Sequence, residues 1–147
     1  MDPYVMRFLR SALVWLLLGV TLGAAMALRP AWQVYRPVHL HMLLLGFVFM
    51  MIAGVAYHVL PRFAATPLHA PRLAMAHVYL ANVGLALLVT GFALRARAAP
   101  MATWFLALGG IGSAVGAYAF VWNLWRTLDR AALPFSQLAR APTRAAG

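Results

Sequence analysis

The residues of this chain that could do chemistry are its histidines, because other reactive side chains are scarce. The chain has five histidines, two acidic residues and no cysteine. His39 and His41 begin an apolar run, residues 38–62, that has the length of a membrane span, and His58 lies near its end. An ionisable side chain is costly to place inside such a run, so these histidines predict a functional site. Imidazole suits iron, copper and zinc, so metal ligation is the chemistry we expect.

Several other kinds of chemistry are excluded by composition. The two acids, Asp2 and Asp129, lie near the ends of the chain, so no carboxylate pair and no nucleophile–histidine–acid set supports hydrolysis. The lack of cysteine excludes disulfides, thiolate metal sites and covalent attachment of a c-type heme. The net charge of +10 comes from arginines that separate apolar runs, so we expect contact with lipid headgroups and no nucleic-acid binding.

The elements that must position the histidines are membrane spans. Of the 147 residues, 65% are hydrophobic and only 10% are charged, too few charges to cover a soluble domain. A span needs about 20 residues, which leaves room for roughly four. The sequence therefore predicts an all-α, integral membrane four-helix bundle in contact with the bilayer. We expect one transmembrane domain over residues 1–147, with helices at about 11–28, 38–60, 73–94 and 101–125 and a polar tail at 126–147.

The first of these segments has a second interpretation. Residues 11–28 follow a basic start and contain Ala25-Met26-Ala27, which resembles the cleavage site of a signal peptide. We expect this segment to be a helix of the bundle, because it is long enough to cross the membrane. Gly19 and Gly23 on it, and Gly112 and Gly116 on the last helix, have the spacing that lets another helix approach closely.

The helical period separates the first two histidines. At 100° per residue, His39 shares a face with small and flexible residues, namely Gly46, Met50, Ala53 and Tyr57. His41 lies about 200° away, on a face that suits lipid or a partner subunit and contains Leu45, Val48, Ile52, Val55 and Val59. In a regular helix the two therefore cannot bind one iron together.

The remaining histidines lie further along the chain. His77 shares a face with Gly84, Leu88 and Gly91, which suggests an inward position, whereas Asn82 lies about 140° round and should pair with a neighbouring helix. His58 lies beside Arg62, a position typical of the headgroup region. His69 lies in the loop that follows, where we expect it to be solvated.

Arginine counts predict the orientation. With the N-terminus inside, the inner face carries more arginines than the outer: Arg7, Arg10, Arg62, Arg72, Arg126, Arg130, Arg140 and Arg144 against Arg29, Arg36, Arg95 and Arg97. Both termini should therefore be cytoplasmic. His39 and His41 then lie near the outer surface, and His58 and His77 near the inner one, roughly 20 Å away. One iron cannot bridge these levels. An outer site therefore takes its second ligand from another protomer or from the thioether of Met42 or Met101, or it has one axial ligand alone.

The residues His39 to Phe63, HLHMLLLGFVFMMIAGVAYHVLPRF, resemble helix II of subunit I in the heme–copper oxidase superfamily, especially the high-affinity oxidases and nitric oxide reductases. There, a histidine at the outer start of the helix ligates low-spin heme b and a basic residue closes the helix; His39 and Arg62 stand at these places. Residues Leu73 to Gly84 resemble the start of helix III. The other metal ligands of that subunit lie on later helices, which have no counterpart among the four spans.

The resemblance implies a histidine-ligated membrane protein that binds heme b for electron transfer or for binding a diatomic gas, without oxidase activity of its own. The candidate ligands to the heme iron are His39, His41, His77 and His58. We expect a bacterial cytoplasmic membrane protein that forms homo-oligomers and meets a respiratory-chain electron partner. Two alternatives remain open: a copper or zinc site on the same histidines, and an assembly or structural partner of a respiratory complex whose histidines bind nothing.

Overall fold

The computed structural model describes the backbone of residues 1–138 and the side chains of residues 1–131; the rest of the predicted tail, with Arg140 and Arg144, lies outside the described residues. The described part contains helices and no strand, so the all-α prediction is confirmed. The elements follow in the order α1 (Pro3–Leu28), the 3₁₀ helix η1 (Pro30–Tyr35), α2 (Arg36–His41), the π-helix η2 (Met42–Phe49), α3 (Met50–Phe63), α4 (Pro71–Arg95) and α5 (Ala102–Leu138).

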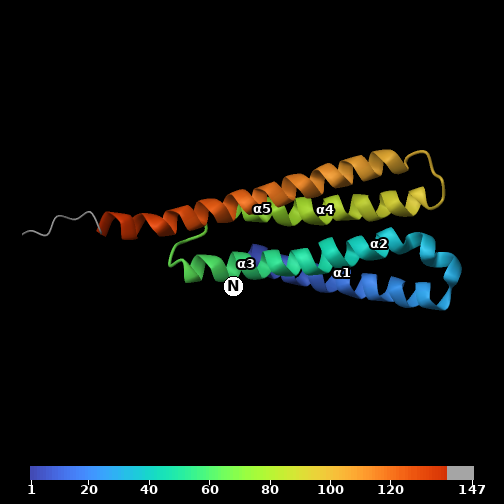
Figure 1. Ribbon diagram of the computed structural model, residues 1–147, viewed down its shortest axis with the longest axis horizontal. Coiled ribbons are helices and arrows are strands. Elements are labelled where there is room, and N and C mark those ends of the chain that lie inside the picture. The colour runs from blue at the N-terminus through green and yellow to red at the C-terminus, as the bar shows by residue number, and fades with distance from the viewer. Residues whose placement is uncertain (139–147) are drawn as a thin grey trace, which may run out of the picture.

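These elements form two antiparallel hairpins that pack side by side (Figure 1). One hairpin is α1 with the continuous helix α2–η2–α3, and the other is α4 with α5. Four segments are long and apolar enough to cross a membrane, which confirms the predicted bundle of spans. The helix α5 starts close to the predicted position but continues past Trp125 to Leu138. Its 37 residues are about 55 Å long, well beyond the roughly 30 Å of hydrocarbon, so its end projects past the other helices.

Proline and alanine mark the helix boundaries. α1 and α4 begin at Pro3 and Pro71, where the missing N–H of proline costs nothing. The turns that follow α3 and α4 each contain an alanine with left-handed backbone, Ala65 (φ 47°) and Ala98 (φ 54°). After α3, the N–H of Thr66 donates to the carbonyl of Pro61, and after α4 that of Ala99 donates to Leu94, each at 3.0 Å. These bonds satisfy carbonyls that the helix leaves unpaired.

The second span is not regular. Its middle, η2, is a π-helical stretch of eight residues that directly follows His39 and His41. Gly46 lies inside it, and a Cβ there would come within 2.6 Å of the Trp15 Cβ on α1 and 2.9 Å of Leu85 on α4. A π-helical segment is rare and is frequent at functional sites. The sequence gives no periodic signal for it, because every residue of the stretch is apolar or glycine.

Glycines bring α4 and α5 into backbone contact. A Cβ on Gly109 would lie 2.5 Å from the backbone N of Leu88, and one on Gly84 would lie 2.7 Å from the backbone N of Ser113. In the other hairpin, a Cβ on Gly19 would lie 2.6 Å from Leu43, and one on Gly23 would lie 2.7 Å from the His39 ring. The close approach that these small residues predict therefore takes place within one chain. The homo-oligomer stays a prediction, and these glycines do not supply its interface.

The loop between α3 and α4 is fastened to α5 by a buried amide. The Nδ2 of Asn123 donates to the carbonyl of Ala70, and the N–H of Ala70 donates to the Oδ1 of Asn123, both at 2.9 Å. Next to this pair, the N–H of His69 donates to the hydroxyl of Thr127 at 2.9 Å. Asn123 and Thr127 are both fully buried. These three bonds tie the start of α4 to α5, so they fix the relative height of the two helices.

We predict that Gly109→Ala destabilises the chain strongly, whereas Gly110→Ala at the adjacent position does not. The new methyl group at residue 109 would meet the backbone of α4, which cannot move aside as a side chain can, whereas a Cβ at residue 110 has nothing within 4 Å. Overpacking of this kind costs about 1–3 kcal/mol or more. Thermal unfolding in detergent measures the difference. Equal melting temperatures for the two variants would contradict the backbone contact.

Candidate functional site

His39 is held by a backbone carbonyl of α1. Its Nδ1 lies 2.8 Å from the carbonyl oxygen of Gly19. A carbonyl only accepts, so Nδ1 carries the proton and Nε2 of the neutral ring keeps its lone pair. The ring is half-buried against Gly23, where a side chain would collide with it. An imidazole whose Nδ1 donates to a carbonyl and whose Nε2 is free has the arrangement that metal-ligating histidines usually show.

A contact with its own helix gives His41 the same tautomer, with the proton on Nδ1. Its Nδ1 lies 2.8 Å from the carbonyl oxygen of Pro37, one turn earlier, and its ring stacks on Phe92 of α4 with centroids 4.6 Å apart. The predicted outward face is present, since Val48, Ile52 and Val55 are exposed. The ring itself folds back along the helix and packs against α4. His39 and His41 therefore point toward different helices, as their spacing predicts.

His77 lies at the centre of the bundle and is fully buried. Its Nδ1 lies 3.2 Å from the hydroxyl of Tyr57, and its Nε2 is buried without a hydrogen-bond partner among the described residues. Aromatic rings enclose it on several sides: Phe8 at 4.7 Å, Phe120 at 5.5 Å, and Phe49 and Tyr57 at 5.9 Å between centroids. Leaving a buried polar group unpaired costs about 1–3 kcal/mol, so this imidazole lowers stability where an apolar ring would not.

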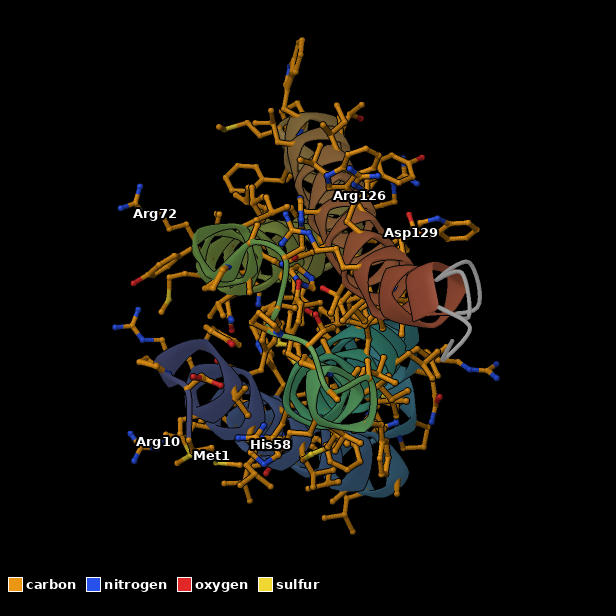
Figure 2. All side chains as sticks on the ribbon, turned by 90° about the vertical axis from the view of Figure 1, so that its left-hand side faces the viewer. Met1, Arg10, His58, Arg72, Arg126 and Asp129 are labelled. Atoms are coloured by element: carbon orange, nitrogen blue, oxygen red, sulfur yellow. The ribbon has the colours of Figure 1, made fainter. Side chains whose placement is uncertain are left out.

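Tyr57, and not His58, meets His77. The guanidinium of Arg62 donates to Nδ1 of His58 at 2.9 Å, and also to its backbone carbonyl. Arginine only donates, so the proton of the neutral His58 ring is on Nε2 and the ring offers no free lone pair. Figure 2 shows His58 at the periphery of the bundle, seen from the end that holds the N-terminus. This geometry agrees with the expected headgroup position beside Arg62.

The candidate ligands lie at two separate levels. His39 packs against Gly19 and Gly23, whereas His77 packs against Phe8 of the same helix. Phe8 and Gly19 are eleven residues apart, which is about 16 Å of helix. Within the part of the chain whose side chains are described, no three His, Asp or Glu side chains gather as a metal cluster.

Two hollows are each lined by one aromatic neighbour of His77, Tyr57 in the first and Phe49 in the second, and His77 itself lines neither. The first, here called the end pocket, has a volume of about 360 Å³ and opens at the N-terminal end of the bundle, where Asp2, Tyr4, Tyr57, Arg62 and Thr66 supply its polar lining. The second, here called the core cavity, has about 70 Å³. It lies between η2, the start of α3, α4 and α5 and is lined by Leu45, Phe49, Met50, Ala81, Ser113 and Ala117. The hydroxyl of Ser113 is buried without a partner among the described residues.

His69 is less solvated than the sequence suggests. It is half-buried, and its Nδ1 is buried without a partner among the described residues. Burial lowers the pKa of His69 below its ordinary value, and the positive charges of Arg130 and Arg126 lower it further. The hydrogen bonds of Asn123 and Thr127 to this loop, here called the loop clamp, explain the difference because they hold the loop against α5.

The sequence does not predict Tyr57, Asn123 or the phenylalanines as partners in this region. It places Tyr57 on the inward face without pairing it with His77, and the signal for the pair is a polar aromatic residue on a face of small residues. The pairing of Asn82 with another helix is correct, since the indole N–H of Trp15 donates to its Oδ1 at 3.1 Å. Asn123 and the phenylalanines around His77 carry no motif, because their roles depend on contacts between distant segments.

Comparison with protein families gives a match over nearly the whole chain. The family described as Cytochrome C and Quinol oxidase polypeptide I matches residues 4–142. The chain therefore belongs to this family, as its resemblance to heme–copper oxidase subunit I predicts, and it is an oxidase-related membrane protein of a family that binds hemes. Comparison with curated proteins and with solved structures finds no match.

We predict that the chain is less stable at pH 5 than at pH 7.5, and that His69→Asn reduces this difference. The pKa of His69 is lowered in the folded chain, so the unfolded chain binds the proton more readily. The stability from the neutral ring is present above the unfolded pKa of about 6.5 and is lost as the pH falls toward the lowered value. Melting temperatures of both proteins at the two pH values measure it. An unchanged pH dependence in the variant would show that other groups control it.

Proposed function

We propose that this member of the cytochrome c and quinol oxidase polypeptide I family binds heme b through Nε2 of His39. The observation that supports this most is the bond of 2.8 Å from His39 Nδ1 to the Gly19 carbonyl, which fixes the tautomer and orients the ring. Histidines that bind metals usually have such an outer partner, and losing it typically weakens binding 10–100-fold. The π-helix that follows adds a second local feature typical of functional sites.

The side chains fit one half of a heme site better than a whole one. The core cavity of about 70 Å³ is far smaller than a porphyrin, and the aromatic rings around His77 fill the space beside it. His39 is half-buried at the edge of the bundle, where a flat ligand can approach from outside the four helices. We therefore propose that His39 supplies one axial ligand and that the heme lies between this chain and another.

The identity of the other chain decides the role. A second histidine from another copy or from an electron partner would give six-coordinate iron and electron transfer, whereas a single ligand would leave a position for a diatomic gas. When bound, the heme would supply one-electron redox chemistry or gas binding. The Gly19 carbonyl orients the His39 ring and holds the ring proton on Nδ1, so Nε2 keeps its lone pair.

The other candidate histidines rank behind His39. His41 has the same free Nε2, so it is the second choice. His58 has its lone pair engaged by Arg62, and His77 lies in a closed aromatic cage, so we assign neither to the iron. The copper or zinc alternative needs ligands from more than one chain, because the described residues hold no cluster of three donors.

We predict that His39→Gly loses heme binding and that added imidazole restores it. Free imidazole can occupy the space of the removed side chain and supply the missing nitrogen, whereas a general loss of structure would not be restored. Absorption spectra of oxidised and dithionite-reduced protein, with and without carbon monoxide, measure binding and coordination. We expect heme affinity to fall more than about tenfold in the variant.

His58→Ala is the control, because it removes an imidazole that Arg62 already engages, and it should keep the wild-type spectrum. His41→Ala tests the second choice. Unchanged heme bands in His39→Gly would overturn the assignment. A wild-type protein without heme bands after growth with ample heme would favour the alternative, an assembly partner of a respiratory complex.

We further propose that both termini face the cytoplasm of a bacterium. The end of the bundle with the N-terminus carries Arg7, Arg10, Arg62, Arg72, Arg126 and Arg130, and the other end carries Arg29, Arg36, Arg95 and Arg97. Figure 2 shows Arg10 and Arg72 projecting away from the helices at the first end. The larger positive charge is expected on the cytoplasmic side.

Single cysteines test this orientation directly, because the chain has none of its own. Pro67 and Pro100 are exposed residues of the two loops on opposite ends of the bundle. In intact cells, a maleimide that cannot cross the membrane should label Pro100→Cys and should label Pro67→Cys only after lysis. The reverse pattern would place both termini outside.

A further inference from the structure

We propose that a groove between α1 and α4 binds the headgroup of one anionic phospholipid. The groove, here called the inter-hairpin groove, lies where the two hairpins meet and has a volume of about 270 Å³. It is lined by Arg10, Ser11, Val14, Trp15 and Leu18 of α1 and by Asn82 of α4. None of these residues is a histidine, so the lipid site is separate from the heme ligands proposed above.

The inter-hairpin groove changes from charged to apolar along α1. Arg10 and Ser11 lie at its polar end, and Val14 and Leu18 at its apolar end are 54% and 48% exposed. From Arg10 to Leu18 is about 12 Å of helix, inside a segment that is long and apolar enough to span a membrane. A phospholipid has the same order, since its phosphate lies at the membrane surface and its acyl chains extend inward.

The positive charge at the polar end is not balanced by an acid of the chain. The two acids are Asp2, which lines the end pocket, and Asp129, which pairs with Arg126 at 3.8 Å. In the part of the chain that the structure describes, neither acid lines the inter-hairpin groove. Arg7 and Arg10 are three residues apart on one helix, a spacing at which like charges repel each other. An anion bound beside them would relieve this repulsion.

Arg7 is held in place by neutral partners on α4. Its Nη1 donates to the hydroxyl of Tyr79 and to the sulfur of Met75, the latter at 3.3 Å. The guanidinium carbon also lies 5.6 Å from the centre of the Tyr79 ring. These contacts fix the side chain but leave its charge uncompensated and its other N–H groups for a ligand. A cation that is already ordered loses less entropy when an anion binds.

A third arginine comes from the start of α4. Arg72 precedes Tyr79 by seven residues, which is about two turns, so it lies on the face of α4 that meets Arg7. Figure 2 shows Arg10 beside α1 and Arg72 beside α4, both projecting on the same side of the bundle. The positive charge is therefore supplied by both hairpins around one groove.

The groove also offers a hydrogen-bond donor below the arginines. The Oδ1 of Asn82 accepts from the indole N–H of Trp15 at 3.1 Å, and its Nδ2 donates to the carbonyl of Val78 at 2.8 Å. An amide nitrogen carries two hydrogens, so one N–H of Asn82 is left for a ligand. Ser11 adds a hydroxyl at the same groove. Guanidinium, amide and hydroxyl donors together suit a ligand rich in acceptors, such as a phosphate diester with its ester carbonyls.

Exposed arginines attract anionic lipid to a membrane surface without selecting a site. What favours a defined site here is the groove beneath them, with an oriented amide and an apolar extension. A free anion would gain nothing from Val14 and Leu18, which lie in the spanning segment, whereas an acyl chain would pack against them. We therefore assign the site to a lipid and not to free phosphate.

The test is native mass spectrometry of the full-length chain released from membranes that contain equal parts of phosphatidylglycerol and phosphatidylcholine with the same acyl chains. We expect the chain to retain one phosphatidylglycerol in preference to phosphatidylcholine. Arg10→Gln should reduce the retained anionic lipid about fivefold, the share of one arginine near a membrane surface. Arg130→Gln is the matched control, since it removes the same charge from α5 outside the groove and should retain the lipid.

A second pair of variants tests the groove without changing charge. Val14→Trp would fill the groove, whereas Leu17→Trp places the same ring at an equally exposed position of α1 that does not line it. Only Val14→Trp should lose the lipid, and melting temperatures in detergent show whether both variants remain folded.

Three results would overturn the proposal: equal retention of the two lipids, wild-type retention in Arg10→Gln, or equal loss in the two tryptophan variants. Displacement of the lipid by added inorganic phosphate would show a site for the free anion and would also overturn the assignment. His39→Gly should retain the lipid whether or not it binds heme, so the two proposals fail separately.

Discussion

Backbone contact between α4 and α5 is the constraint on which the rest of this bundle depends. Gly109 and Gly84 let the two helices approach until a single methyl group would strike a backbone atom of the other helix. A membrane offers little hydrophobic force between helices, so such close packing is a main source of attachment. The same approach places Gly116 against His77 and brings Asn123 to the backbone of Ala70. The buried imidazole and the loop clamp are therefore both consequences of one glycine-lined contact.

The buried amide side chains and the buried threonine of this molecule have hydrogen-bond partners. Asn123 and Thr127 have backbone partners, and Asn82 pairs with Trp15. The histidines of the spans are different, because each has one ring nitrogen engaged and no internal hydrogen bond for the other within the described residues. An unpaired nitrogen is costly where it is fully buried, as Nε2 of His77 is, so stability does not explain this imidazole.

The sequence predicted what depends on composition and on period. Four apolar runs gave four spans, and the faces of Tyr57 and of His77 were correctly expected to turn inward. The pairing of Tyr57 with His77 depends on the relative height of two helices, which a single sequence does not contain. The sequence does not predict the π-helix, because residues 42–49 are all apolar or glycine and no polar residue changes its spacing where the turn widens. The sequence predicts a solvated His69, because a short loop contains no signal for contacts with Asn123 and Thr127, which lie more than fifty residues away in the chain.

The π-helical stretch also sets a phase between the two ends of the second span. His39 and His41 lie before it and Tyr57 lies after it, so the histidines toward one membrane surface and the tyrosine toward the other are joined through a wider turn. Conversion of all eight residues to ordinary helix at unchanged length would rotate one end against the other, because a residue in an i→i+5 turn advances by less than the 100° of an α-helix. The span thus behaves as two segments with an adjustable joint, and a change of helix type there would alter which face each end presents while leaving both ends helical.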